Sequence, residues 1–230
     1  MKVVVSTYFD KRYYKWAFLL VQSLLINEPD IAVYLHGINL KDWQIEEISR
    51  FKNVRGVDYY VIDREGKTSE EFSWHVIERK AAFFRRVFTY FSDADIYILM
   101  DVDTLIVNPL KKLIEQMKDY DMAGVQTNPQ KIMGGFLVAK NIPVVKEYWK
   151  ELDEFLMGDG VFYYNKDQPE IFRLYEKYKE RIRFLPLSWE YLDIWSRETS
   201  DIYVWSAHKT EYGDKNQRYE LYKDKVRRMQ

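Results

Sequence analysis

An unbroken apolar segment near the middle of the chain, followed at once by two acidic residues, constrains the fold most. Ile96–Met100 are all apolar, and Asp101 and Asp103 follow with Val102 between them. A short run that is apolar on both faces is typical of a central strand of a parallel sheet, covered by helices on both sides. Alternate residues of an extended chain point the same way, so the two carboxylates are expected to converge. The sequence therefore predicts a buried strand whose carboxyl end presents a pair of acids.

Short apolar runs and stretches of helical period alternate along the rest of the chain. This order predicts a mostly parallel sheet with helices on both faces, which is an α/β fold. The expected strands are 3–5, 31–35, 57–62, 96–100, 122–126, 136–139, 183–185 and 203–207. The expected helices are 15–27, 41–51, 73–90, 108–119, 142–156 and 168–178.

The composition fits one large domain. With 230 residues, of which 47% are hydrophobic, the chain can bury a substantial core, and no repeat or linker divides it. We expect an α/β domain over 1–215 and an irregular, basic tail over 216–230. The 35 basic and 36 acidic residues give a net charge of -1, which argues against nucleic acid as a partner.

Several other classes of protein are also excluded or disfavoured. The absence of cysteine excludes disulfides, thiolate metal sites and thiol catalysis. No run reaches the roughly 18 apolar residues of a membrane span, and no signal peptide precedes the first strand, so we expect a cytoplasmic protein. The basic tail is either a surface helix or a peripheral contact with the inner face of the membrane.

The acid pair predicts a metal site. Two carboxylates at one point need a cation, and hard divalent ions such as Mg²⁺ and Mn²⁺ bind a few carboxylates while leaving positions for water and phosphate oxygens. Ligands of open α/β sheets bind at the carboxyl ends of strands, which is where Asp101 and Asp103 are expected. The pair is therefore a candidate site for a diphosphate, with a solvated turn as the alternative.

Residues 97–110, which carry both aspartates, resemble the metal-binding segment of nucleotide-sugar-dependent glycosyltransferases with the GT-A fold. The resemblance is strongest to family 8, the glycogenin and lipopolysaccharide galactosyltransferase group, and matching segments follow in order over about 1–215. It implies a single GT-A-like domain with a mixed, mostly parallel sheet. It also implies transfer of a sugar from a UDP- or GDP-sugar, with retention, to a glycan, lipid-linked or protein acceptor, and Mn²⁺ or Mg²⁺ as cofactor.

The resemblance further implies roles for individual residues. Asp101, Asp103 and His208 match the metal ligands, and Asp101 also matches a donor contact. Asp167 and Gln168 match an acidic–glutamine pair near the reaction centre. The remaining donor contacts are expected at the first strand and helix, the helix before the metal strand, a glycine pair and the end of the domain: Ser6, Thr7, Tyr8, Tyr14, Lys80, Arg85, Gly134, Gly135, Lys209 and Lys215.

Several of these residues also have an ordinary structural interpretation. Asp167 could cap the helix expected to start near Gln168. Lys80 and Arg85 could lie on a solvated helical face. The family's sequence after the metal-binding histidine differs from 209–215 here, which leaves open whether either lysine of that segment reaches the diphosphate.

Two other functions fit part of the pattern. Phosphohydrolases of the haloacid dehalogenase type also place two aspartates after an apolar strand. Thr104 falls one position early for that motif, however, and the acids lie in mid-chain rather than near the start. A catalytically silent relative that binds a sugar nucleotide would carry the same residues, because fold does not fix function.

Overall fold

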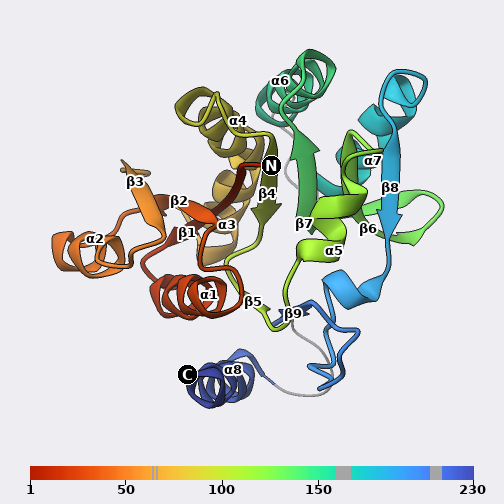
Figure 1. The fold of residues 1–230 in the computed structure, drawn as a ribbon. Coiled ribbons are helices and arrows are strands. Elements are labelled where there is room, and N and C mark those ends of the chain that lie inside the picture. The colour runs from red at the N-terminus through yellow and green to blue at the C-terminus, as the bar shows by residue number, and fades with distance from the viewer. Residues whose placement is uncertain (64, 66, 159–166, 208–213) are drawn as a thin grey trace.

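The structure of the chain, a computed structural model, describes residues 1–63, 65, 67–158, 167–207 and 214–230. Its described strands form a seven-stranded central sheet in the order β3-β2-β1-β4-β7-β6-β8 (Figure 1). Neighbouring strands are parallel except at β7, which runs antiparallel to β4 and to β6. The mixed, mostly parallel sheet expected from the sequence is therefore confirmed. The strands of this sheet are β1 (Val3–Asp10), β2 (Ala32–Ile38), β3 (Val54–Tyr60), β4 (Ile96–Met100), β6 (Met122–Asn128), β7 (Lys131–Lys140) and β8 (Phe184–Leu187).

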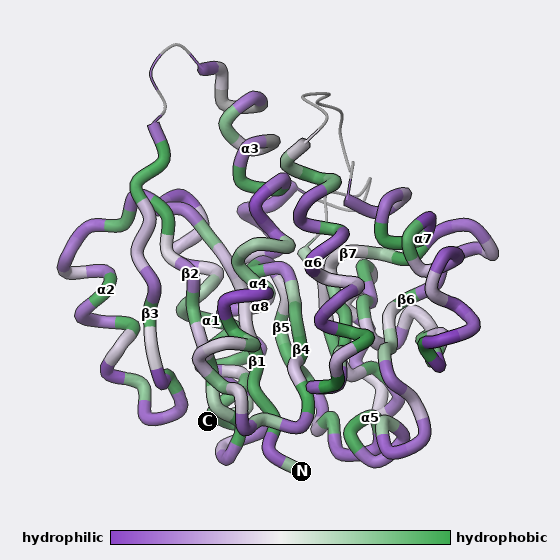
Figure 2. The backbone as a smooth tube through the Cα atoms, turned by 90° about the horizontal axis from the view of Figure 1, so that it is seen from above, coloured by the Kyte–Doolittle hydropathy of each residue, from purple (hydrophilic) through white to green (hydrophobic). Residues whose placement is uncertain are grey.

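Helices cover both faces of the sheet, because its strands are apolar on both sides. Along β1, Val5 belongs to the core on one face and Val4 to the core on the other. Figure 2 shows hydrophobic residues along β1 and β4 and mixed hydropathy along α6 and α7. On one face lie α1 (Tyr14–Asn27), α2 (Asp42–Ser49), α5 (Lys111–Gln116) and α8 (Lys215–Met229). On the other lie α3 (Ser69–Glu78), α4 (Lys80–Tyr90), α6 (Pro143–Gly158) and α7 (Asp167–Tyr178).

The single helix expected over 73–90 is instead two helices. The first, α3, ends at Glu78 and α4 begins at Lys80, with φ -80° and ψ 0° at Arg79 between them. No proline or glycine marks the break, and the helical period continues through it, so the sequence does not reveal it. The break makes Lys80 the first residue of α4, where it is buried.

The glycine pair lies within a strand and not in a turn before it. The strand β7 begins at Lys131, earlier than the expected start at 136, so Gly134 and Gly135 are part of it. Its register with β4 pairs Phe136 with Met100, the last residue of β4. The first residues of β7 therefore extend past the carboxyl end of β4, over the acid pair.

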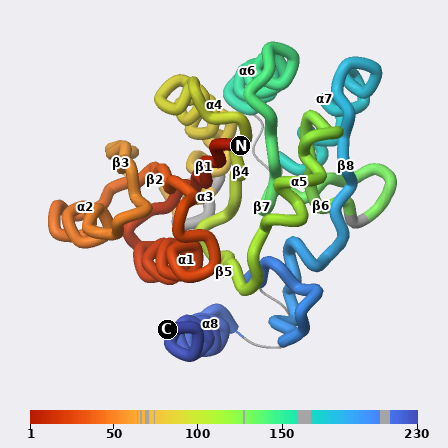
Figure 3. The backbone as a smooth tube through the Cα atoms, viewed as in Figure 1, coloured from red at the N-terminus to blue at the C-terminus, as the bar shows by residue number. Residues whose placement is uncertain are grey.

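The expectation of an irregular tail over 216–230 is wrong. A capping box at Asp214 starts α8, and the helix packs on α1 (Figure 3). The ring of Tyr222 is buried 5.6 Å from that of Trp16, which explains why these residues form a docked helix. In the described part of the chain, none of the helices combines the length and the hydropathy that a membrane span requires.

A small second sheet attaches the C-terminal part of the chain to the acid pair. The strand β5 (Thr104–Ile106) starts directly after Asp103 and pairs antiparallel with β9 (Val204–Ser206), and both are labelled in Figure 1. The backbone N–H of Ala207 continues this pairing and donates to the carbonyl oxygen of Asp103 at 2.8 Å. The last strand therefore fixes the backbone of the second aspartate.

Candidate functional site

A cavity of about 430 Å³ opens at the carboxyl ends of β1 and β4, beside the first residues of β7. This is the edge of the sheet at which α/β proteins bind ligands. Both aspartates of the pair line it, together with side chains from α3, α4, α7, α8 and the 3₁₀ turn Trp189–Tyr191. The lining residues used below are Tyr8, Asp10, Arg12, Tyr13, Lys80, Asp101, Asp103, Lys131, Met133, Gly135, Asp167, Gln168, Trp189, Leu192, Ile194 and Lys215.

Hydrogen bonds to the backbone of Asp101 hold the turn that carries the acid pair. The strand β4 ends at Met100, so the two aspartates lie just beyond it. The N–H of Asp101 donates to the carbonyl oxygen of Gly135 at 2.9 Å, and the hydroxyl of Thr104 donates to the carbonyl oxygen of Asp101 at 2.6 Å. Val102, between the acids, packs into the core. Both carboxylates line one cavity, as expected, although they lie in the turn after β4 and not within an extended strand.

One buried lysine bridges two of the acids. The ammonium of Lys80 lies 3.1 Å from Asp101 Oδ1 and 2.9 Å from Asp167 Oδ2. Burial lowers the pKa of Lys80, but the two carboxylates outweigh it and hold that pKa well above its ordinary value. The pKa of Asp101 is raised, first by burial and then by the neighbouring carboxylates of Asp103 and Asp167, against the opposing effect of the lysine. Lys80 therefore stays charged and neutralises part of an acidic site.

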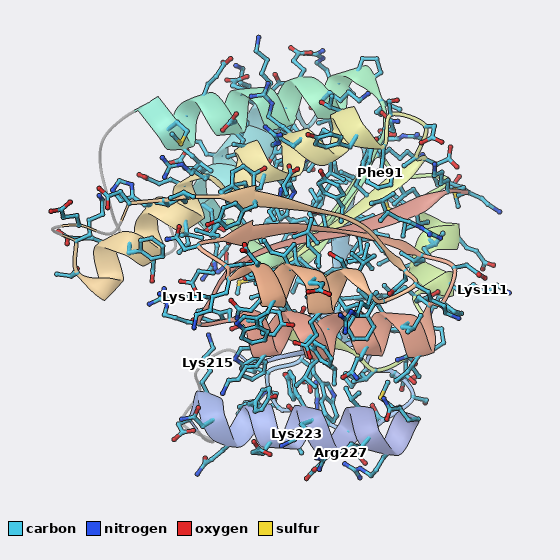
Figure 4. All side chains as sticks on the ribbon, turned by 90° about the vertical axis from the view of Figure 1, so that its left-hand side faces the viewer. Lys11, Phe91, Lys111, Lys215, Lys223 and Arg227 are labelled. Atoms are coloured by element: carbon cyan, nitrogen blue, oxygen red, sulfur yellow. The ribbon has the colours of Figure 1, made fainter. Side chains whose placement is uncertain are left out.

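The second aspartate has its own lysine, which comes from the C-terminal helix. Lys215 Nζ lies 2.7 Å from Asp103 Oδ2 and donates to the hydroxyl of Tyr13 at 3.0 Å. Figure 4 shows this lysine extending from the first turn of α8 toward the body of the domain, with Lys223 and Arg227 further along the helix. Burial lowers the pKa of Lys215, but Asp103 and Tyr13 raise it by more, so it is charged.

The buried ion pair of Lys80 and Asp167 fits beside Gly134 because this residue has no side chain. A Cβ atom at this position would lie 2.2 Å from Asp167 Oδ2 and 2.9 Å from Lys80 Nζ. The neighbouring Gly135 is less crowded, because a Cβ atom there would lie 3.1 Å from Asp101 Oδ2. The glycine pair was expected against a donor sugar, but in this structure the first glycine lies against the side chains of Asp167 and Lys80.

The acid pair suits a hard divalent cation. Each carboxylate meets its lysine through one oxygen, and within the described residues no hydrogen bond or ion pair engages Asp101 Oδ2 or Asp103 Oδ1. Two hard oxygens facing one cavity are the donor set that Mg²⁺ or Mn²⁺ prefers. Among those same residues no third His, Cys, Asp or Glu completes a cluster. The expected third ligand, His208, and the neighbouring Lys209 lie outside the described residues.

Asp167 and Gln168 reach the same cavity from the first turn of α7. The carboxylate of Asp167 is only 4% exposed and contacts Lys80. The amide oxygen of Gln168 is buried and has no hydrogen-bond partner among the described residues. A buried acceptor of this kind is costly unless a ligand hydroxyl satisfies it. This second observation, independent of the acid pair, points to a polar ligand.

Four of the expected donor contacts lie elsewhere. Ser6 and Thr7 are fully buried within β1 and do not line the cavity, because their side chains point into the two cores. Tyr14 turns away and donates to Glu47 at 2.6 Å. Arg85 faces a separate hollow of about 880 Å³ between α4 and α6, where it pairs with Asp153, and that hollow contains none of the cavity's aspartates.

Other lining residues were not singled out from the sequence. Asp10 and Arg12 form an ion pair of 2.7 Å at the end of β1, and the rule that ligands bind at strand ends would have found them. Lys131 and Trp189 also line the cavity. Only the pairing of β7 and β8 with β6 brings them there, so no local signal predicts them.

Comparison with solved structures finds proteins that share this fold. No protein-family model matches the sequence, and no curated protein matches it. A crystal structure of the galactosyltransferase LgtC in complex with donor and acceptor sugar analogues matches with TM-score 0.55 and 10% identity over 98% of this chain and 95% of that one. The apo form of the glycosyltransferase GlyE of Streptococcus pneumoniae TIGR4 matches with TM-score 0.64 and 12% identity over 98% of this chain and 60% of GlyE.

These likenesses concern the fold. A third solved structure, the bifunctional glycosyltransferase WbbM, matches with TM-score 0.54 and 13% identity over 97% of this chain and 44% of WbbM. The order of strands and the near-complete coverage confirm the fold expected from the aspartate segment. The chain has the GT-A fold and resembles in structure the galactosyltransferase LgtC of family 8.

Proposed function

We propose that the protein is a metal-dependent glycosyltransferase that moves a sugar from a nucleotide-diphosphate donor to an acceptor hydroxyl. The observation that carries the proposal is the meeting of Asp101, Asp103 and Asp167 with Lys80 and Lys215 in one cavity at the carboxyl ends of the strands. The solved structures that share the fold are named as glycosyltransferases, which supports the same reaction class.

The proposed step is a substitution at the anomeric carbon. The bond from this carbon to the diphosphate oxygen breaks, and its electron pair leaves with the nucleoside diphosphate. The acceptor's hydroxyl oxygen forms the new bond, and its proton passes to the departing diphosphate. The resemblance implies retention of the anomeric configuration, so the acceptor approaches from the face that the diphosphate leaves.

One group of residues in the cavity would bind the metal ion and the diphosphate. Asp101 and Asp103 would hold a Mg²⁺ or Mn²⁺ ion through their unengaged oxygens, with His208 as the proposed third ligand. A bound cation of this kind neutralises charge that develops on the diphosphate. Lys215 lies at the same end of the cavity and is placed to contact the diphosphate oxygens as well.

The other acid faces the reacting carbon in this proposal. The carboxylate of Asp167 would stabilise positive charge at the anomeric carbon. Lys80 holds that carboxylate in place through their ion pair of 2.9 Å. The unpaired amide oxygen of Gln168 would accept a hydrogen bond from a sugar hydroxyl.

Isothermal titration tests the donor and metal parts of the proposal. We expect UDP or GDP to bind at least tenfold more tightly with Mn²⁺ present, and Asp103→Ala to abolish that gain. Asp93→Ala, which alters an exposed carboxylate at the opposite end of β4, serves as the control. A nucleotide affinity that is equal with and without the metal would remove the cation from the proposal.

Turnover distinguishes an enzyme from a silent binder. Wild-type protein with Mn²⁺ is expected to hydrolyse a UDP- or GDP-sugar slowly in the absence of acceptor, because water can replace the acceptor hydroxyl. Nucleotide binding without any release of sugar would instead support the silent sugar-nucleotide binder. Turnover of an aryl phosphate would favour the phosphohydrolase.

A further inference from the structure

One face of β7 forms a strip that leads away from the acid pair. Lys131, Met133 and Gly135 alternate along this strand, so their side-chain positions share a face, and all three line the cavity. Gly135 lies beside Asp101, whose backbone N–H donates to its carbonyl oxygen. Lys131 is four residues earlier, roughly 13 Å along an extended strand. The strip therefore extends from the candidate reaction centre to a lysine at the end of the β6–β7 hairpin.

Apolar side chains lie beside the start of this strip, where Leu192 approaches Gly135. Trp189, Leu192 and Ile194 line the cavity, from the segment that follows β8. The parallel pairing of β6 with β8, which sets Val125 beside Leu187, brings the start of this segment to the same edge of the sheet. Trp189 is 41% exposed, so a large part of its indole is available to a ligand. Aromatic rings at such positions pack against the apolar faces of sugar rings.

The lysine at the end of the strip differs from the other cations of the cavity. Lys80, Lys215 and Arg12 are each held by an aspartate at 3.1 Å or less. Lys131 also lines the cavity, but within the described residues it forms no ion pair. It is half-buried, so part of its hydration is already lost. A partly desolvated cation without a carboxylate favours an anionic group of a ligand.

We infer that the acceptor is an anionic saccharide, held with a sugar ring against Trp189 and its carboxylate, phosphate or sulfate at Lys131. This inference rests on the proposed function, because it assigns the half of the cavity that the nucleotide does not fill. The roughly 13 Å along β7 exceeds the width of a single sugar ring, so the anionic group lies on a ring other than the one that carries the reacting hydroxyl. The acceptor is therefore an acidic oligosaccharide and not a lone neutral sugar.

Binding to a set of immobilised glycans tests the inference without knowledge of the acceptor. The set contains neutral oligosaccharides and their counterparts that carry a carboxylate, a phosphate or a sulfate, and the protein is applied with UDP and Mn²⁺. Wild-type protein is expected to bind acidic glycans about tenfold more tightly than neutral ones. The acidic counterpart that binds most tightly identifies the anionic group. Lys131→Ala should abolish this preference, while Lys131→Arg should keep most of it.

Two further variants separate the ring contact from the charge contact. Trp189→Ala is expected to weaken binding of neutral and acidic glycans alike by about tenfold, because the loss of stacking does not depend on charge. Lys111→Ala, on the exposed surface of α5, is the matched control for Lys131→Ala and should change nothing.

The outcomes distinguish this inference from the proposed function. Titration with UDP and with GDP in the presence of Mn²⁺ comes first, and a chain that binds neither nucleotide contradicts the proposed function itself. If UDP binds normally, three results would overturn the inference and leave the donor site in place. The protein could retain no glycan, or it could bind neutral and acidic glycans equally. The preference for acidic glycans could also survive Lys131→Ala.

Discussion

The ammonium of Lys80 lies 2.9 Å from Oδ2 of Asp167, although the two residues are 87 positions apart in the chain. The same ammonium is 3.1 Å from Asp101 Oδ1, so one buried cation joins the candidate metal ligand to the candidate acid of the reaction centre. Both members of the Lys80–Asp167 pair are less than 5% exposed. The arrangement couples the stability of the fold to the charge balance of the site.

Replacement of Lys80 alone should destabilise the fold more than replacement of both Lys80 and Asp167. In Lys80→Met the carboxylate of Asp167 remains buried without its cation, and we expect the free energy of unfolding to fall by about 3 kcal/mol. The double variant Lys80→Met, Asp167→Asn buries no unpaired charge at this position and should recover at least half of that loss. Urea denaturation of the wild type, both single variants and the double variant measures the coupling. Strictly additive losses would show that the two groups do not interact.

A methyl group at position 134 should disturb the same pair. The Cβ atom of Gly134→Ala would lie 2.2 Å from Asp167 Oδ2, so the carboxylate has to move. We expect sugar transfer or donor hydrolysis to fall about 100-fold, because misplacement of about 1 Å in a site costs that much. Gly158→Ala is the control, since nothing lies within 4 Å of the added Cβ. Equal activity of the two variants would contradict the assigned role of Asp167.

Lys215 on α8 should weaken the binding of metal and strengthen the binding of nucleotide. Lys215 Nζ competes with a cation for Asp103, and it is also placed to contact the diphosphate. We therefore expect Lys215→Ala to bind Mn²⁺ alone about tenfold more tightly and UDP with Mn²⁺ about tenfold more weakly. Titration calorimetry measures both affinities. Lys223→Ala, further along the same helix and paired with Glu220, should leave both unchanged. A shift of both affinities in the same direction would rule out the competition.

A buried histidine outside the cavity should make the fold sensitive to acid. Burial lowers the pKa of His36 to about 3, with Asp58 opposing and Arg86 assisting the shift. In the unfolded chain the pKa is about 6.5, so between these values only the unfolded state binds the proton. The contribution is therefore complete above pH 6.5 and is lost as the pH falls toward about 3, by up to about 1.4 kcal/mol per pH unit.

A substitution that cannot titrate isolates this contribution. The free energy of unfolding of His36→Gln should depend less on pH than that of the wild type between pH 6.5 and 4.5, whatever its absolute stability. Denaturant unfolding at several pH values gives the two slopes. His75→Gln, at a half-buried position on α3, is the matched control. Identical slopes for the wild type and His36→Gln would mean that the buried ring is not neutral in the folded state.

The basic residues of α8 do not form an unpaired charged surface. Lys223 pairs with Glu220 at 3.1 Å, and Arg228 pairs with Glu198 at the same distance. Arg227 lies 3.5 Å from Asp224. Peripheral membrane contact through this helix remains a prediction, and its electrostatic attraction to anionic lipid is reduced by these partners.

The main sheet and the acid pair could be predicted from residues close together in the sequence. The apolar run Ile96–Met100 required a strand buried on both faces, and the alternation of side chains required Asp101 and Asp103 to converge. Both are local properties, set by hydropathy and by backbone geometry. The lengths of β1 and β7 were underestimated because Ser6 and the glycine pair interrupt the apolar runs, yet tertiary pairing extends both strands over them.

The sequence by itself determined an α/β sheet with two carboxylates at its edge, because hydropathy and periodicity act over short distances. Only the tertiary structure decided which groups meet those carboxylates. The break at Arg79 turns Lys80 inward, the docking of α8 on α1 carries Lys215 to Asp103, and strand pairing brings Trp189 and Lys131 to the cavity. These contacts join residues far apart in the chain, and long-range packing rather than local preference brings them together.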